Sequence, residues 1–158
     1  MTVEGGRTTY GHELGILMLD TTFPRIPGDI GNALTFPFPV LYRVVEGASP
    51  RRVVEEADAS LIQPFIAAAK ELERCGVGAI TTSCGFLALF QRELSQAVQV
   101  PLFSSSLIQI PFLYEIFGRR GRVGVLTARA ASLSEAHFSA CGASGIPRLV
   151  SGMDGSEE

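Results

Sequence analysis

The stretch AITTSCGFLALF, from Ala79 to Phe90, decides the fold of this chain. It begins as an apolar strand, passes through small polar residues to Cys84 and a glycine, and then takes the pattern of a helix. In open α/β sheets a strand gives way to a helix at such a junction, and ligands bind at the carboxyl ends of the strands. The stretch therefore predicts both the fold class and the position of a site.

Short apolar runs alternate with helical patterns on both sides of this junction. The predicted strands are Leu14–Leu19, Val40–Val45, Gly78–Thr82, Leu102–Ser105 and Val123–Thr127, with a further strand near Arg148–Ser151; the predicted helices are Leu61–Arg74, Phe86–Ala97, Leu107–Phe117 and Leu133–Cys141. Runs that are apolar on both faces suit a sheet that is covered on both sides. The alternation predicts an α/β fold with a doubly wound parallel sheet flanked by helices.

Length and composition limit the class of protein. With 158 residues, of which 46% are hydrophobic, the chain has the size of one ordinary domain and can bury a core. The net charge is −3 and Lys70 is the only lysine, which argues against a nucleic-acid partner. The longest uncharged run, Leu94–Tyr114, contains two prolines and mixed polar residues, so we expect no membrane span. The first residues lack a basic start before an apolar core, which predicts a cytoplasmic protein with free thiols.

One long segment interrupts this regular organisation. Residues Asp20–Pro39 contain four prolines and two glycines and leave the carboxyl end of the first predicted strand. A loop of this length inside a compact domain is usually functional or mobile. We therefore expect it to border the ligand site.

Polar side chains gather at the predicted strand ends. They are Asp20, Thr21 and Thr22 after the first strand, Thr81–Cys84 after the third, Ser104–Ser106 after the fourth and Thr127 after the fifth. Hydroxyls and backbone N–H groups at helix N-termini bind carboxylates or phosphates. A thiol at the same place is expected to have a lowered pKa, which would make Cys84 reactive. Cys75 and Cys141, each just before a helix-ending glycine, are expected to be structural.

Each of these residues also has a purely structural interpretation. Cys84 could be a packed small hydrophobe, Asp20 a cap for the loop it opens, and Thr127 part of a turn. His12 and His137 have no acidic or cysteine neighbour in the sequence, so no metal site is expected. The GxGxxG, GxxxxGK[ST] and GxSxG patterns are absent, which argues against the usual nucleotide sites and a serine hydrolase.

Three motifs carry a resemblance to a known family. GILMLDTTFPRIPGDIGN, GAITTSCGFLALFQREL and RVGVLTARAASL, in this order, resemble the aspartate/glutamate (hydantoin) racemase superfamily over most of Glu13–Ser151. That superfamily also includes arylmalonate decarboxylases and maleate isomerases. The resemblance implies a cofactor-independent enzyme of two similar α/β domains that holds a small carboxylate between them. Residues 1–115 would form the first domain and residues 116–158 the beginning of the second.

The resemblance also implies roles for individual residues. Racemases of this superfamily use two cysteines on opposite sides of the substrate's α-carbon. Cys84 would transfer a proton with the help of Asp20, while the substrate carboxylate would be bound by Thr21, Thr81, Thr82, Ser83 and Thr127.

Two departures from the superfamily pattern shape the expected reaction. The typical first cysteine aligns nearer Thr81 than Cys84, and no counterpart of the second cysteine follows, since Cys141 precedes a helix-stopping glycine. We therefore expect an incomplete chain of weak or no racemase activity, unless a second copy in a homodimer supplies the other face. Racemisation, decarboxylation and cis–trans isomerisation stay open, as does a non-catalytic carboxylate-binding module.

Overall fold

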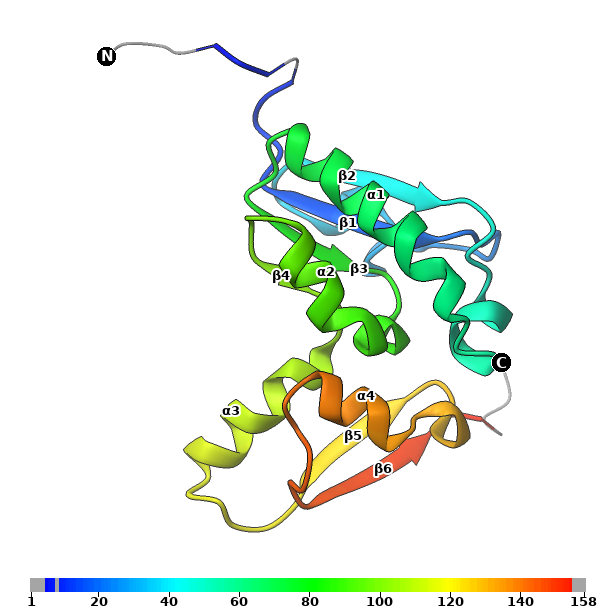
Figure 1. Ribbon diagram of the computed structural model, residues 1–158, viewed down its shortest axis with the longest axis vertical. Helices are drawn as coiled ribbons and strands as arrows, with labels where there is room; N and C mark the ends of the chain where they lie inside the picture. Colours follow the sequence, from blue (N-terminus) through cyan, green and yellow to red (C-terminus); the bar gives the residue numbers. More distant parts are fainter. Residues whose placement is uncertain (1–4, 8, 155–158) are drawn as a thin grey trace.

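Two parallel sheets carry the strands of the molecule. The computed structural model describes residues 5–7 and 9–154. Its strands are β1 (Leu14–Leu19), β2 (Val40–Val45), β3 (Ala79–Thr82), β4 (Leu102–Phe103), β5 (Val123–Thr127) and β6 (Arg148–Gly152). The first four pair in parallel in the order β2-β1-β3-β4, and β5 pairs in parallel with β6 (Figure 1). The predicted α/β fold with a parallel sheet flanked by helices is confirmed.

The helices follow the predicted alternation, with shorter α-helical portions. They are α1 (Ile62–Arg74), α2 (Gln91–Ala97), α3 (Gln109–Ile116) and α4 (Glu135–Ala140); short 3₁₀ helices span η1 (Ala33–Thr35), η3 (Ala59–Leu61), η4 (Gly85–Phe90), η5 (Ser106–Ile108) and η6 (Ala130–Ser132), and a π-helix, η2, spans Arg51–Glu55. The predicted continuous helix Phe86–Ala97 is therefore divided into η4 and α2. In η4 the tighter 3₁₀ winding accompanies the burial of four of its six residues.

The predicted fourth strand is also shorter than its apolar run. Pairing with β3 stops at Phe103. Beyond it, the Ser104 N–H donates to Oε1 of Gln91 at 2.9 Å, so a side chain takes the place of a neighbouring strand. This contact turns the chain away from the sheet and brings Ser104–Ser106 to its carboxyl edge.

The main core lies between the four-stranded sheet and helices α1 and α2. Leu17 and Leu19 of β1 point to this face, where they pack with Phe65 and Leu72 of α1. A Cβ on Gly15 would lie 3.0 Å from a methyl of Leu72, so the helix approaches the strand closely there. Burial of these apolar side chains is the main force that holds α1 and α2 on the sheet.

The opposite face of the sheet is covered by the 20–39 segment instead of a helix. Because side chains alternate along a strand, Met18 points away from α1, and its terminal methyl lies against Gly31. The Tyr42 hydroxyl of β2 donates to the Ile30 carbonyl at 2.9 Å. The segment thus packs across the sheet from the carboxyl end of β1 to the amino end of β2.

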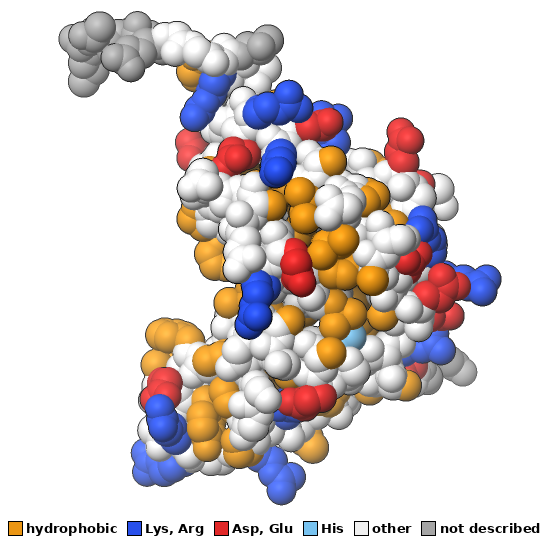
Figure 2. All heavy atoms as spheres, in the orientation of Figure 1, with side chains coloured by type: hydrophobic (Ala, Val, Ile, Leu, Met, Phe, Trp, Pro, Cys, Tyr) orange, Lys and Arg blue, Asp and Glu red, His pale blue; other side chains and the backbone are white. Residues whose placement is uncertain are grey.

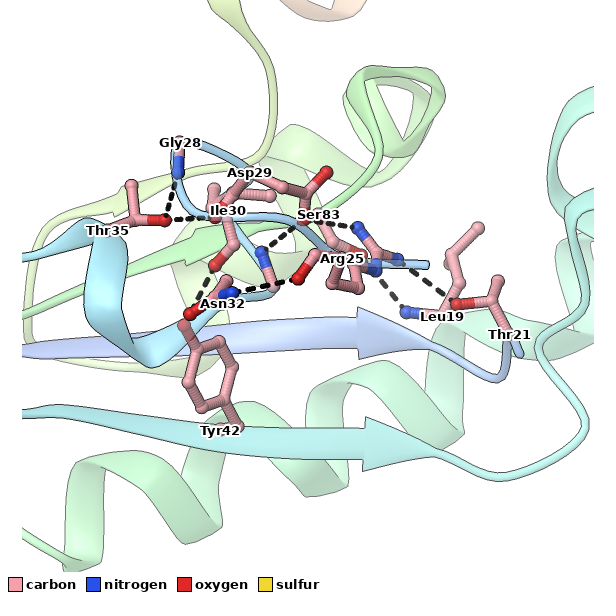
Figure 3. Close-up of polar contacts among 11 residues, drawn as sticks. Leu19, Thr21, Arg25, Gly28, Asp29, Ile30, Asn32, Thr35, Tyr42 and Ser83 are labelled. Atoms are coloured by element: carbon pink, nitrogen blue, oxygen red, sulfur yellow. Dashed lines mark hydrogen bonds and ion pairs between the residues drawn. The ribbon is translucent and has the colours of Figure 1, made fainter. Parts of the chain in front are cut away.

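A network of polar contacts orders this segment (Figure 3). Arg25 forms an ion pair with Asp29 at 2.9 Å and donates to the Thr21 hydroxyl at 3.1 Å. The Asn32 amide donates to the Arg25 carbonyl, and the Thr35 hydroxyl donates to the Asp29 carbonyl. These contacts join residues of the segment to one another and hold its conformation.

The second sheet has one packed face and one open face. Val123, Val125 and Val150 pack against a smaller core that includes Phe138 and the buried Cys141. On the other side of the strands, Leu126 and Leu149 are exposed. The two sheets are joined through α4 and η4, where the ring of His137 meets that of Phe86 edge-on at 5.7 Å between centroids.

The surface carries both signs of charge. Figure 2 shows acidic and basic side chains interspersed on the visible face, in keeping with the small net charge of −3. Within the described ranges, no helix combines the length and the apolar character needed to cross a bilayer. The uncharged run Leu94–Tyr114 instead forms the end of α2, β4 and most of α3, as expected.

Candidate active site

Cys84 lies at the junction of β3 and η4. Its backbone is still extended, with φ −139° and ψ 114°, and the 3₁₀ turn begins at Gly85. The thiol is half-buried and unpaired with any other cysteine. Cys84 therefore lies at the carboxyl edge of the sheet, the position that the sequence predicts for it.

A cavity of about 330 Å³ opens beside this thiol. It is lined by Val54, Ser83, Cys84, Gly85, Phe86, Ser105, Ser106, Leu107, Val125, Leu126, Thr127, Ala128 and Leu133. The lining residues come from both sheets, since Ser83 and Cys84 follow β3 whereas Thr127 ends β5. We call this space the thiol cavity.

The thiol cavity has walls of two kinds. Hydroxyl residues Ser83, Ser105, Ser106 and Thr127 form its polar part, and Val54, Phe86, Leu107 and Leu133 are prominent in its apolar part. Cys84 is the one ionisable side chain among the lining residues. A ligand with an anionic end and an apolar body would match this division.

A second cavity of about 500 Å³ adjoins the first and shares Ser83, Gly85, Ser105 and Ser106 with it. Thr81 and Thr82 belong to this second cavity, together with Ile30 from the 20–39 segment. The Thr81 hydroxyl donates to the Phe103 carbonyl at 2.9 Å. The Thr82 hydroxyl is buried and contacts the carbonyls of Ser104 at 2.7 Å and Cys84 at 3.0 Å. Both threonines thus hold the strand ends together.

Asp20 and Thr21 line neither cavity. The Asp20 carboxylate accepts a hydrogen bond from the Gly47 N–H at 3.0 Å and so fixes the turn that follows β2. The Thr21 hydroxyl accepts from Arg25. The structure therefore brings Ser83, Cys84 and Thr127 together, places Thr81 and Thr82 next to them, and leaves Asp20 and Thr21 outside the cavity walls.

The electrostatic state of Cys84 differs from the expectation. Burial raises the pKa of its thiol above the ordinary value of 9.0, although the backbone N–H groups of Phe86 and Leu87 and the charge of Arg25 act in the opposite direction. The predicted lowering of this pKa is wrong, because desolvation outweighs the effect of a six-residue 3₁₀ turn. Cys84 is mainly a neutral thiol at pH 7.

The other two cysteines differ from each other. Cys141 is buried in the smaller core, and burial raises the pKa of its thiol to about 11. Its predicted structural role fits this position. Cys75 caps the end of α1 and is half-buried, so it is less shielded than Cys141.

Two polar residues near the site were not singled out from the sequence. Gln91 accepts from both the backbone N–H and the hydroxyl of Ser104 and donates to the Leu102 carbonyl, so it shapes the loop that carries Ser105 and Ser106. Arg25 brings a positive charge close enough to influence Cys84. No group of three or more His, Cys, Asp or Glu side chains suited to a metal ion occurs within residues 5–7 and 9–154.

Comparisons with known proteins give named relatives. The chain is 33% identical to a dimethylsulfoniopropionate lyase of Durusdinium sp. clade D over 127 residues, which is 78% of this chain and 42% of the relative. It is 35% identical to dimethylsulfoniopropionate lyase 7 of Emiliania huxleyi over 121 residues, or 76% of this chain and 36% of that protein. The chain thus spans less than half the length of these relatives, and no protein-family model matches it.

A solved structure supports the fold. A variant of arylmalonate decarboxylase associated with sulfate superposes with a TM-score of 0.57 over 92% of this chain and 64% of that chain, at 16% sequence identity. The α/β architecture of this chain is therefore similar to that of arylmalonate decarboxylase, one of the enzymes to which the three sequence motifs pointed. The named relatives, by contrast, are lyases and not racemases.

Proposed function

We propose that this chain catalyses an elimination from a small carboxylate that carries a leaving group on its β-carbon. The observation that carries the proposal is that Cys84 is the one ionisable side chain on the wall of the thiol cavity. Elimination needs one base, whereas inversion at the α-carbon needs acid–base groups on both faces of the substrate. The thiol cavity supplies one such base, Cys84.

The substrate class follows from the relatives and from the cavity walls. Dimethylsulfoniopropionate, the compound named for the relatives, has a carboxylate at one end and a dimethylsulfonium group at the other. The hydroxyls of Ser105, Ser106 and Thr127 suit the carboxylate, and the side chains of Val54 and Phe86 suit the methyl groups. We therefore propose dimethylsulfoniopropionate as a substrate of the present chain.

In the proposed reaction the Cys84 thiolate removes a proton from the α-carbon. The electron pair of that C–H bond forms the α–β double bond, and the bond from the β-carbon to sulfur breaks with its electron pair moving to sulfur. The products are acrylate and neutral dimethyl sulfide, and the proton on Cys84 passes to water. Hydroxyl donors at the carboxylate stabilise the negative charge that develops next to it.

The raised pKa of Cys84 has two consequences for this step. A thiolate of higher pKa is a stronger base, which suits a weakly acidic α-proton. The thiolate is also scarcer at pH 7, so the rate should increase as the pH approaches the pKa of the thiol. The positive sulfonium of the bound substrate would favour the thiolate further.

The remaining sequence predictions enter as parts of the proposal. Ser83 and Thr127 lie on the same polar wall as Ser105 and Ser106 and would bind the carboxylate together with them. Thr81 and Thr82 instead hold the strand ends next to this wall. Asp20 would act through the turn at Gly47 and not on the substrate. Residues 1–115 and 116–158 would be two domains that share the thiol cavity, and a second copy of the chain could complete it.

Decarboxylation is the second candidate. Loss of CO₂ from a malonate leaves a carbanion that one thiol can protonate, so the same single acid–base group would suffice. This reaction belongs to the alternatives that the sequence motifs leave open. Offering the protein an arylmalonate beside dimethylsulfoniopropionate separates the two reactions by their products.

The test uses the purified 158-residue chain with dimethylsulfoniopropionate, with dimethyl sulfide followed by gas chromatography and acrylate by NMR. Cys84→Ala should reduce the rate by about 100-fold or more, and Cys75→Ala should not change it. Substrate deuterated at the α-carbon should react more slowly. In deuterated water, aspartate and glutamate should show little inversion and at most slow α-deuteration.

Two results would count against the proposal. One is the absence of dimethyl sulfide from folded wild-type protein in both its monomeric and dimeric fractions. The other is equal turnover by wild type and Cys84→Ala, which would make the thiol a packing residue and favour a carboxylate-binding module.

A further inference from the structure

An ion pair stands at the margin of the thiol cavity. Nη1 of Arg129 lies 2.6 Å from Oε1 of Glu55. Glu55 ends η2, and Arg129 follows β5, so the pair connects the two parts of the chain that carry the two sheets. The residues just before them, Val54 and Ala128, both line the cavity. Each charged residue is therefore one position along the chain from a lining residue, a place that we call the rim, and the lining itself contains no Asp, Glu, Lys or Arg.

This pair differs from the other ion pairs of the described ranges. It alone joins an element of the four-stranded-sheet part to the part that carries β5 and β6; the pair Arg119–Glu115, for example, lies within one turn at the end of α3. Its two side chains are 48% and 49% exposed, so water and small ions can compete for either charge. A bound ligand can replace one partner at small cost.

We propose that Glu55 is the residue that recognises the cationic end of the ligand, and that Arg129 is its resting partner in the free protein. This inference rests on the proposed function, because it assigns the second charge of the same substrate. With the carboxylate against Ser105 and Ser106 inside the cavity, the sulfonium end extends toward the rim. Glu55 then exchanges Arg129 for the sulfonium, and Arg129 turns to solvent.

The chemistry of the elimination adds a release step. When the C–S bond breaks, the sulfonium becomes a neutral thioether, so its attraction to Glu55 disappears. Arg129 can then pair with Glu55 again. The pair would thus favour entry of a zwitterion and exit of an uncharged product, with no covalent change at either side chain.

Substitution of the two partners should therefore change the affinity for a cationic ligand in opposite directions. Arg129→Gln frees Glu55 and should strengthen binding of a cationic ligand end, whereas Glu55→Gln should weaken it. If the pair only joined the two parts of the chain, both variants would loosen the cavity and change binding in the same direction. Opposite signs thus separate recognition from a structural role.

The probe is 3-(trimethylammonio)propionate, a zwitterion with a poor leaving group, compared with 4,4-dimethylpentanoate, which has the same shape without the positive charge. Binding is measured as protection of Cys84 from iodoacetamide, a neutral reagent, with Cys75 read in the same peptide map as the internal standard. This measurement needs no turnover. Circular dichroism establishes that each variant is folded.

We expect wild type to prefer the zwitterion, Arg129→Gln to increase that preference about three- to tenfold, and Glu55→Gln to abolish it. Glu115→Gln, which breaks the remote Arg119–Glu115 pair, should leave the preference unchanged. High salt should reduce the effect of Arg129→Gln, since the rim is exposed.

The inference would be overturned by equal preferences in wild type and both variants, by shifts of the same sign, or by the absence of protection by either ligand in wild type. Dimethyl sulfide release with unchanged preferences would support the proposed function and overturn the role of Glu55. The expected preferences without dimethyl sulfide release would support Glu55 as a recognition residue and count against the elimination.

Discussion

The hydroxyl of Ser83 accepts a hydrogen bond from the backbone N–H of Leu19 at 3.1 Å, which ties the residue before Cys84 to the end of β1 (Figure 3). The Ser83 N–H in turn donates to the Leu17 carbonyl at 2.9 Å. The position of the thiol is therefore set by the neighbouring strand as well as by its own. Ser83, which the sequence predicts as a carboxylate ligand, therefore also stabilises the strand ends.

Ser83→Ala should lower the free energy of unfolding by about 1–2 kcal/mol, because the Leu19 N–H loses its partner in a half-buried position. Ser95→Ala is the matched control, since the Ser95 hydroxyl donates to the Arg92 carbonyl of its own helix in a solvent-exposed contact. Urea denaturation of the two variants measures the difference. Equal stability of Ser83→Ala and wild type would show that water replaces the serine without cost.

Thr82→Val should destabilise the protein by about 1–3 kcal/mol, since the buried carbonyls of Ser104 and Cys84 would lose a shared donor. Thr82→Ser keeps the hydroxyl and should recover most of the loss. Chemical denaturation measures both variants. A Thr82→Ser variant as unstable as Thr82→Val would mean that the methyl group, and not the hydroxyl, supplies the stability.

Alkylation of Cys84 should accelerate with pH through the whole range from 7 to 9. Burial raises the pKa of this thiol, so the reactive thiolate is a minor species there and its fraction grows about tenfold per pH unit. Cys141, whose pKa is about 11 and which is buried, should remain unmodified in the native protein over this range. Mass spectrometry of iodoacetamide-treated protein follows each site. A rate at Cys84 that is already constant above pH 7 would contradict the raised pKa.

Arg25→Gln should destabilise the protein by about 1 kcal/mol at pH 7 and by less as the pH falls below 4. Burial opposes ionisation of Asp29, but hydrogen bonds from Arg25 and the Gly31 N–H hold its pKa below the ordinary value of 3.8. A carboxyl whose pKa is lower in the folded state contributes stability above its unfolded pKa and loses it as the pH falls through the folded pKa.

Thermal unfolding of Arg25→Gln at pH 7 and pH 3 measures this difference. Arg51→Gln is the control, because the Arg51 side chain is 78% exposed and its pair with Glu56 should contribute little. Arg25→Gln should also slow alkylation of Cys84, since it removes a positive charge that favours the thiolate. An unchanged alkylation rate would mean that Arg25 only stabilises the 20–39 segment and does not affect the thiol.

The strands could be predicted well wherever an apolar run has clear ends. Leu14–Leu19, Val40–Val45 and Val123–Thr127 form as predicted, because the polar and proline residues that flank them end the pattern. The Leu102–Ser105 run is cut short by the Gln91 side chain, a contact that hydrophobic periodicity does not encode. The η4 turn likewise depends on how its residues pack in the core.

In the candidate site, too, some features follow from local sequence and others depend on contacts between distant segments. The rule that parallel strands of one sheet end at one edge places Ser83 and Cys84 at the carboxyl edge of the first sheet. Thr127 ends β5 of the second sheet and lines the same cavity because the two sheets pack together through α4 and η4, which the rule does not predict. The same rule cannot say that Asp20 turns to the Gly47 N–H. The pKa of Cys84 depends on burial by segments far away in the sequence, so its direction could not be obtained from the local helix start.

The pairing of β1 with both β2 and β3 also governs the order in which the protein can assemble during translation. A nascent chain released only as far as Val45 can form the β1–β2 pair, a two-stranded ribbon that is marginally stable by itself. The Leu17 side chain cannot be covered by α1 until Leu72 has been made. Strand β1 cannot pair with its second neighbour, β3, until Thr82 has been made. The apolar centre of the sheet is thus exposed on the ribosome until β3 has been made, and the need for chaperones should be greatest before β3 emerges.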